Sequence, residues 1–301
     1  LLVMEGHPAR LENFGFIYPP LPILITSLLN GNVLLAQSIV AALISAALAL
    51  DIRKAVPSME QAFPLIIYMT FCFPILFLAT QGFDFYLYFF IVVLCIRFLY
   101  RHEKKEASLD LFMAGILFGV TFFIHFSSIY LIPMFFILIC MIYRNQPQKI
   151  MPVSLSFFTP FLVSLLIFSY VNLIFTGEAF GFLKKHKLLF SNSDIDAVLS
   201  SGSFMSSLYY MLKYVVWVVP VIVPYLLGFR YHKSVVLVLP FMVLLSLIYA
   251  NLFYPAIFLC SVFIIHFLLM NDFWGSLKQK TLLAALGISL ASAPVMALIS
   301  T

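Results

Sequence analysis

Charge is the scarcest property of this 301-residue sequence, in which charged residues make up 10% of the chain. Soluble proteins carry roughly a quarter. A chain with so few polar side chains cannot cover its surface in water, so the composition excludes a soluble globular protein. Cysteine is also rare, and the four thiols lie in apolar segments without metal-ligand spacing. This excludes a disulfide framework, and we expect buried apolar thiols at Cys72, Cys95, Cys140 and Cys260.

Apolar residues are abundant instead, at 63% of the chain with 34 phenylalanines. They fall into about nine segments able to cross a bilayer, which takes about 20 residues of helix. The sequence therefore predicts an integral, multi-pass membrane protein: an all-α polytopic transmembrane helical bundle, with residues 1–301 as a single transmembrane domain. The first predicted spans cover 32–50, 62–79, 85–100 and 153–175, with a shorter pair at 111–124 and 129–143.

The most distinctive stretch is residues 14–31, an aromatic lead-in followed by a proline-rich corner and a short apolar helix. Proline pushes the preceding residue out of the α region, so Tyr18 and Pro19 should be extended. Pro20 or Pro22 can open the helix, where the missing N–H is tolerated. The Asn–Gly pair at its end should stop it. We expect this stiff corner to lie at a membrane interface.

Lysine and arginine are unevenly divided between the two sides of the predicted bundle. Twelve fall on the side opposite the proline corner and five on the corner's side. Cytoplasmic loops carry the excess of positive charge, so the corner's side faces out of the cytoplasm. The outer-face segments are then the loop and short helix at 1–31, Asp84, and the loop at 176–203. Because the basic residues are dispersed between spans, the net charge of +5 indicates no nucleic-acid partner.

Several polar residues have two interpretations each. Asp84 is either a solvated turn residue beside Gly82 or an acid facing a cleft, and His125 is either bonded to a neighbouring helix or functional. Lys184 and Lys185 belong either to an amphipathic turn at the lipid headgroups or to a phosphate site. By contrast, the GxxxG spacing of Gly115 and Gly119 predicts close helix packing and no chemistry.

Three motifs resemble those of the GT-C glycosyltransferases, polytopic enzymes that use polyprenyl-phosphate-linked sugars. Residues 16–24 look like the family's first outer loop, 114–125 like its "AG-apolar-G" span, and 172–182 like a loop after a later span. Asp84 matches an acid at the outer end of a returning span. This family includes protein O-mannosyltransferases and lipid A aminoarabinose transferases. The resemblance implies inverting transfer of a sugar to a lipid, glycan or protein acceptor on the outer face.

The resemblance also assigns roles to residues. A carboxylate would accept the proton of the acceptor hydroxyl, with Asp84, Glu12 and Glu5 as candidates. Cations would stabilise the leaving lipid phosphate, and Tyr18, Pro19 and Pro20 would shape the entrance. The phosphate-side candidates are His125, Lys184 and Lys185. No cofactor is certain, a divalent metal stays open, and membrane lipids are the expected surroundings.

The sequence departs from the family in two respects. The family's main catalytic carboxylate follows a first span that is not seen before the proline corner, so we expect a native N-terminus with one further span. His125 stands where relatives often carry lysine or arginine. A polytopic transporter and a non-catalytic membrane scaffold are the alternatives, although the repeated half typical of transporters is not found. The lack of a long soluble tail favours a bacterial or archaeal plasma membrane.

Overall fold

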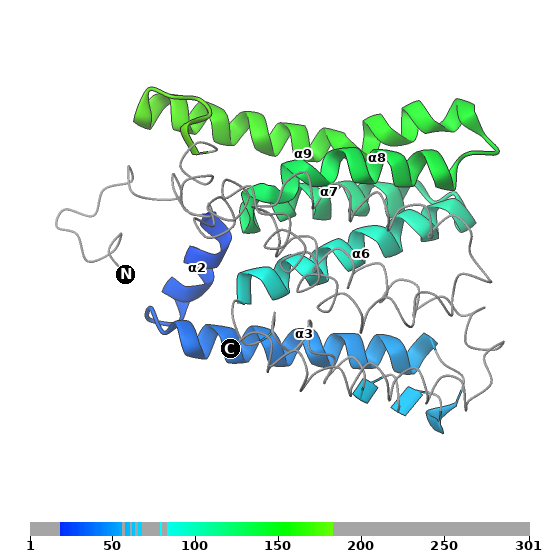
Figure 1. The fold of residues 1–301 in the computed structure, drawn as a ribbon, viewed down its shortest axis with the longest axis horizontal. Coiled ribbons are helices and arrows are strands. Elements are labelled where there is room, and N and C mark those ends of the chain that lie inside the picture. The colour runs from blue at the N-terminus through cyan, green and yellow to red at the C-terminus, as the bar shows by residue number, and fades with distance from the viewer. Residues whose placement is uncertain are drawn as a thin grey trace, which may run out of the picture. The chain divides into compact units, whose positions relative to one another are not determined.

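The computed structural model describes residues 19–55, 58–60, 62–63, 66–67, 79 and 83–182 (Figure 1). Its secondary-structure elements over these residues are six α-helices and one 3-10 helix, with no strand. The all-α prediction is therefore confirmed for the described residues. By its contacts the chain divides into two compact units, Leu1–Val40 with Phe83–Ser191 and Ala41–Gly82 with Asn192–Thr301.

The proline corner opens the short helix α2, Pro20–Leu28, as the sequence predicted. Pro19 is extended, with φ −58° and ψ 137°, and Pro20 occupies the first helical position. The helix stops where Asn30 and Gly31 take positive φ angles of 54° and 75°. Glycine adopts this region without strain, and asparagine tolerates it better than most residues. The local sequence alone thus sets both ends of α2.

Helix α3, Val33–Ala55, follows directly. Its N-terminus is capped by Asn32, whose Oδ1 accepts a hydrogen bond from the Leu35 backbone N–H at 3.0 Å. Arg53 and Lys54 lie in its last turn, where cations interact favourably with the helix dipole. Among the described residues, this helix and α9, Pro147–Thr176, are the two long and apolar enough to cross a membrane.

Helices α6, Phe83–Lys105, and α7, Ser108–Ile124, pack side by side as an antiparallel hairpin. Both are longer than the sequence indicated. Asp84 was expected in a turn but lies in the first turn of α6, where the dipole favours an acid. The charged stretch after residue 100 was expected as a connecting segment, yet the helix continues to Lys105. Lysine, arginine and glutamate are good helix formers, so charge did not end it.

The chain then turns at the 3-10 helix η2, Phe126–Tyr130, and returns through α8, Leu131–Ile142. The rings of Phe118 and Phe135 are 4.9 Å apart, which brings α8 back alongside α7. A second turn leads into α9, which begins with Pro147 at its first position and ends at Gly177 in the left-handed conformation.

Helix α7 packs closely against α9, and glycine makes this approach possible. A Cβ added to Gly115 would lie 2.9 Å from the Phe157 carbonyl oxygen, and one added to Gly119 would lie 3.2 Å from the Pro160 backbone. The prediction of close packing by this GxxxG spacing is confirmed. Stacked rings extend the contact, with the Phe118 centroid 4.5 Å from that of Phe161.

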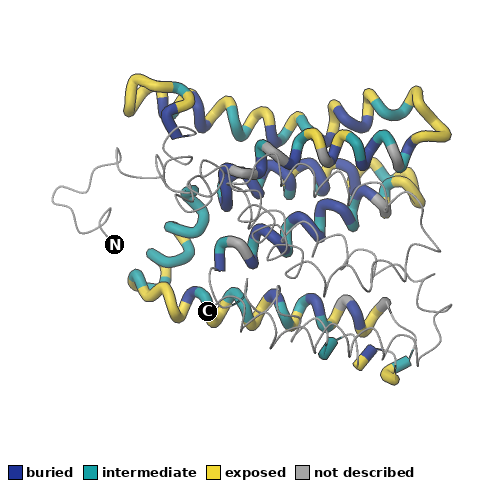
Figure 2. The backbone as a smooth tube through the Cα atoms, in the orientation of Figure 1, coloured by how far each residue is buried: buried dark blue, intermediate teal, exposed yellow. Residues whose placement is uncertain are grey.

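Helix α9 exposes apolar side chains along its length, and its buried side combines phenylalanines with polar residues. Ser154, Ser169 and Asn172 are among its buried residues. Figure 2 shows exposed positions along the helix, and most of them carry apolar side chains. The exposed large apolar side chains are Met151, Leu155, Leu162, Val163, Leu166, Ile167, Tyr170, Leu173, Ile174 and Phe175.

Candidate functional site

The candidate site lies at the end of the first unit where α6 begins and α7 ends. The antiparallel hairpin brings these two ends together, since a short turn at residues 106–107 joins the other ends of the two helices. Helix α2 also contacts α7. Three segments that the sequence singled out, namely the proline corner, the start of α6 and His125, therefore belong to one packed unit.

Asp84 and His125 are related through Tyr88. Asp84 and Tyr88 are four residues apart in α6 and so lie on the same face of the helix, one turn from each other. The Tyr88 ring lies 5.8 Å from the His125 ring, centroid to centroid, at an interplanar angle of 45°. Tyr88 and His125 are buried, whereas Asp84 is partly exposed. Sequence analysis assigned no role to Tyr88, although its four-residue spacing from Asp84 places the two on one face of a helix.

His125 is held at the point where α7 stops. It adopts an extended conformation, φ −154° and ψ 124°, and its backbone N–H donates to the Thr121 carbonyl oxygen at 2.9 Å. Its own carbonyl oxygen accepts the N–H of Ser128 at 3.1 Å. The Ser128 side chain is fully buried, and its Oγ has no hydrogen-bond partner among the described residues. Buried hydroxyls without a partner are unusual in folded proteins.

Four phenylalanines pack together beside this histidine, from α7, η2, α9 and the segment after α9. The Phe126 ring is 5.2 Å from that of Phe168 and 4.9 Å from that of Phe182. Phe122 contacts Phe168 and Phe182 at 5.6 Å and 5.9 Å. Phe182 is fully buried, so the chain folds back over the end of α9 after Gly177. The candidate site thus adjoins a rigid apolar wall.

Some of the other predicted site residues lie in the described part of the chain and some lie outside it. Pro19 and Pro20 are at the start of α2, as expected. Tyr18, Glu5, Glu12, Lys184 and Lys185 lie outside the described residues, as do Cys72 and Cys260. Of the remaining thiols, Cys95 is buried as predicted and Cys140 is partly buried. The roles assigned to the site residues stay predictions.

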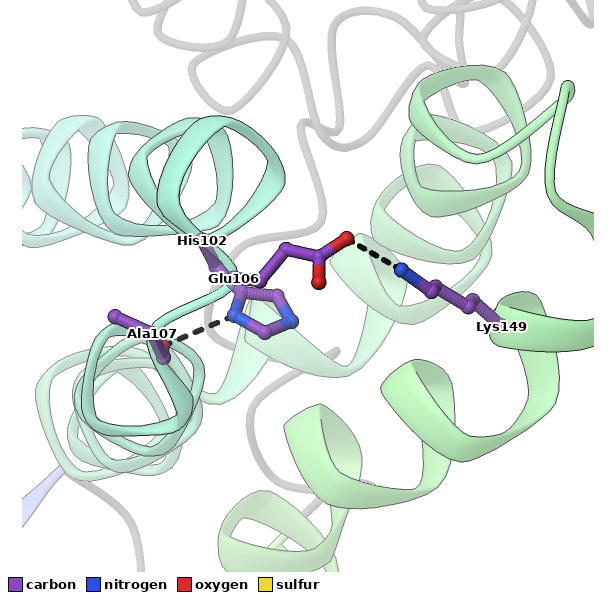
Figure 3. Close-up of polar contacts among 4 residues, drawn as sticks. All are labelled: His102, Glu106, Ala107 and Lys149. Carbon is purple, nitrogen blue, oxygen red and sulfur yellow. Dashed lines mark hydrogen bonds and ion pairs between the residues drawn. The ribbon is translucent and has the colours of Figure 1, made fainter.

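A second polar cluster lies at the opposite end, where the α6–α7 and α8–α9 turns meet (Figure 3). Lys149 Nζ donates to Glu106 Oε1 at 2.5 Å, and a hydrogen bond of 3.0 Å joins His102 Nδ1 as donor to the Ala107 carbonyl oxygen. The His102 ring is 6.3 Å from that of Tyr143. The sequence analysis did not predict that these two segments would be joined.

Beside these contacts, the Arg101 guanidinium lies 3.3 Å from the Asp110 carboxylate and 5.3 Å from the centroid of the Phe98 ring. Asp110 is buried, whereas Arg101 is half exposed. A buried carboxylate needs such a partner, because an unpaired charge away from water is costly. This pair therefore secures the start of α7 to the end of α6.

Two groups in this cluster have displaced pKa values. The hydrogen bond from Lys149, and then its charge, lower the pKa of Glu106 from its ordinary value of 4.5. Burial, followed by the charges of Glu103 and Glu106, raises the pKa of Tyr143 to about 12. The Tyr143 hydroxyl is buried and has no hydrogen-bond partner within the described part of the chain.

Residues 19–55 and 83–182, with the shorter described stretches, contain no group of three or more His, Cys, Asp or Glu side chains placed to hold a metal ion. Comparison of the chain with protein-family models, with curated proteins and with solved structures finds no match. The interpretation of the site therefore depends on its geometry and on the motifs of the sequence.

Proposed function

We propose that the chain is a polytopic membrane glycosyltransferase of the GT-C kind, which moves a sugar from a polyprenyl-phosphate donor to an acceptor outside the cytoplasm. One observation carries the proposal: the Tyr88 ring, one turn along α6 from Asp84, lies 5.8 Å from the His125 ring at the end of the unit opposite its basic turns. The excess of Lys and Arg marks those turns as cytoplasmic. An acid and a buried imidazole then lie on the outer side, where lipid-linked sugars are used.

Insertion in a bilayer is supported by the side-chain distribution of α9. An exposed apolar face combined with buried serine and asparagine is unfavourable in water but suits a helix that contacts lipid on its outer side. The close glycine packing of α7 on α9 is also typical of membrane helices. The proposal includes about nine spans in a bacterial or archaeal plasma membrane, of which α7 and α8 are shorter than the roughly 20 residues that a crossing usually takes.

The proposed chemistry assigns one task to each polar group. The Asp84 carboxylate accepts the proton of the acceptor hydroxyl as that oxygen attacks the anomeric carbon. The bond from the anomeric carbon to the lipid phosphate oxygen breaks, and configuration at carbon inverts. His125 donates a ring N–H to the leaving phosphate, whose charge Lys184 and Lys185 of the outer loop are proposed to stabilise. Tyr88 holds the imidazole in position by ring contact.

The decisive experiment replaces Asp84 by asparagine in the full chain. Membranes containing the protein are supplied with polyprenyl phosphate carrying radiolabelled mannose or aminoarabinose, and label transferred to lipid, glycan and protein fractions is measured. Asp84→Asn should abolish transfer, because an amide accepts no proton at neutral pH. Glu103→Gln is the matched control, since it makes the same change in an exposed acid at the opposite end and should leave transfer intact.

Other outcomes would contradict the proposal. Retained transfer in Asp84→Asn would remove this residue from the site. Absence of transfer in the unchanged protein, together with failure to bind the labelled donor, would refute the glycosyltransferase and favour a transporter or a scaffold. Uptake of labelled solutes into vesicles that contain the chain would separate those two.

A further inference from the structure

Three exposed cations belong to the two segments that meet at this end of the first unit, where the His102 and Tyr143 rings are 6.3 Å apart. Lys104 and Lys105 lie in the last turn of α6, and Arg144 lies in the α8–α9 turn. The ion pair between Glu106 and Lys149 fixes the two turns against each other. We refer to Lys104, Lys105 and Arg144 as the basic patch.

The acids nearby do not neutralise this patch. Asp110 is paired with Arg101, and Glu106 is paired with Lys149. Among the described residues, no ion pair involves any of the three cations of the patch. The exposed carboxylate of Glu103 is then the remaining negative charge of the two turns. The patch therefore presents a net positive surface to a ligand.

Large apolar side chains are exposed near the starts of the two helices that follow these turns. Leu109, in the first turn of α7, is 69% exposed, and Met151, near the start of α9, is 72% exposed. Cations at the ends of helices with exposed apolar residues one turn further in are typical of a membrane interface, where the charged groups meet headgroups and the apolar ones meet acyl chains. A soluble acidic protein would match the charges but would leave the apolar side chains uncovered.

We infer that the basic patch binds the phosphate headgroup of an anionic phospholipid in the cytoplasmic leaflet. The lipid phosphate lies between the ammonium groups of α6 and the guanidinium of the second turn, and its acyl chains lie along Leu109 and Met151. This inference depends on the membrane insertion proposed above but not on sugar transfer. A lipid held there ties the α6–α7 hairpin to the α8–α9 turn, as the Glu106–Lys149 pair does within the protein.

The test compares two matched double variants of the full chain, purified in a neutral detergent. Lys104→Gln/Lys105→Gln removes two adjacent cations from the last turn of α6. Arg53→Gln/Lys54→Gln removes two adjacent exposed cations from the last turn of α3. Binding of dioctanoyl phosphatidylglycerol and of dioctanoyl phosphatidylcholine is measured by native mass spectrometry. Unfolding temperatures in the neutral detergent show whether each variant is folded, and Arg144→Gln provides a second, independent change.

The unchanged protein should bind phosphatidylglycerol more tightly than phosphatidylcholine, and added salt should weaken this binding. The α6 double variant should bind it about 30-fold more weakly, since each cation at a charged membrane surface contributes about 1 kcal/mol, or roughly fivefold. The α3 double variant should bind as the unchanged protein does. Arg144→Gln should weaken binding about fivefold.

Three results would overturn the inference. An equal loss in both double variants would show a diffuse charge effect without a site. Inorganic phosphate that competes with the lipid at equal concentration would show an anion site with no lipid specificity. Tighter binding of polyglutamate than of phosphatidylglycerol would indicate an acidic protein partner. Because none of these measurements uses a sugar, a chain that binds the lipid yet transfers no sugar would refute only the proposed activity.

Discussion

Glu106 and Lys149 form an ion pair with 2.5 Å between Oε1 and Nζ, and they connect two turns 43 residues apart in the sequence. Glu106 does so from an uncommon backbone conformation, with φ at 53°. Its backbone N–H donates to the His102 carbonyl oxygen at 2.7 Å, which closes the end of α6. One residue thus ends a helix and fixes the position of a neighbouring turn.

This pair predicts an acid-dependent loss of stability. The pKa of Glu106 is lower in the folded protein than its ordinary value of 4.5, so its contribution is present above pH 4.5 and is lost as pH falls through the folded value. Unfolding temperature in detergent, measured between pH 3 and 7, should fall less for Glu106→Gln than for the unchanged protein. High salt should reduce the difference, since both side chains are solvent-accessible. Identical pH profiles for Glu106→Gln and the unchanged protein would contradict a stabilising role of the ion pair.

The conformation of Glu106 predicts a second, separable effect. Glycine adopts φ near 53° without strain, whereas glutamine at this position retains the strain and loses the ion pair. Glu106→Gly should therefore unfold at a higher temperature than Glu106→Gln, at neutral pH and in the same detergent. The opposite order would show that the backbone relaxes once the ion pair is gone.

Close packing at Gly115 predicts that alanine at this position lowers the stability of the protein, although alanine favours helix formation. Alanine normally stabilises a helix relative to glycine by about 1 kcal/mol. In Gly115→Ala the new Cβ would lie 2.9 Å from a carbonyl oxygen of α9, so the variant should instead lose about 1–3 kcal/mol. Unfolding by SDS in mixed micelles measures this, with Ile116→Ala, which truncates an exposed side chain of the same helix, as control. A stabilised Gly115→Ala would refute the close approach.

The ion pair of Arg101 and Asp110 predicts that removing an arginine destabilises the protein more when its partner carboxylate is buried. Arg101→Gln would leave a buried carboxylate without its cation, and we expect a loss of about 1–3 kcal/mol. Arg144→Gln removes the same charge from an exposed side chain that forms no ion pair with a described residue, and it should change stability little. The same SDS titration distinguishes the two. Equal effects would show that Asp110 is not stabilised by its partner.

The buried hydroxyl of Tyr143 predicts an alkaline transition. The pKa of Tyr143 is raised to about 12 in the folded protein. The neutral side chain therefore contributes fully to stability below its ordinary pKa of 10.0, and this contribution is lost as pH rises through about 12. Tyr143→Phe should remove this component of the pH dependence. It should also be neutral or slightly stabilising at pH 7, because it deletes a buried donor without a described partner. A marked loss of stability at pH 7 would reveal a hydrogen bond to the hydroxyl.

Local sequence accounts for much of the fold that the structure describes. The helix start at Pro20, its end at Asn30 and Gly31, and the stop of α9 at Gly177 all follow from the backbone preferences of those residues. Helix ends with no such signal were predicted less well. The sequence placed the end of α6 where charge begins, but helix-forming lysine and glutamate carry it to residue 105.

The candidate site was predictable only in part. The sequence singled out Asp84 and His125 because acids and histidines are rare in apolar segments. It could not show that Tyr88, one turn from Asp84, contacts His125, since that depends on the register of α6 against α7.

By itself, the sequence determined the helical class of the described residues, the ends of α2, and the glycine face through which α7 packs closely on another helix. Each of these follows from the conformational range or size of individual residues. Only the tertiary structure decided that Lys149 reaches Glu106 and that Tyr88 reaches His125. Such contacts depend on how far one helix is shifted and rotated against another. That is set by the packing of many side chains together, so no short stretch of sequence contains it.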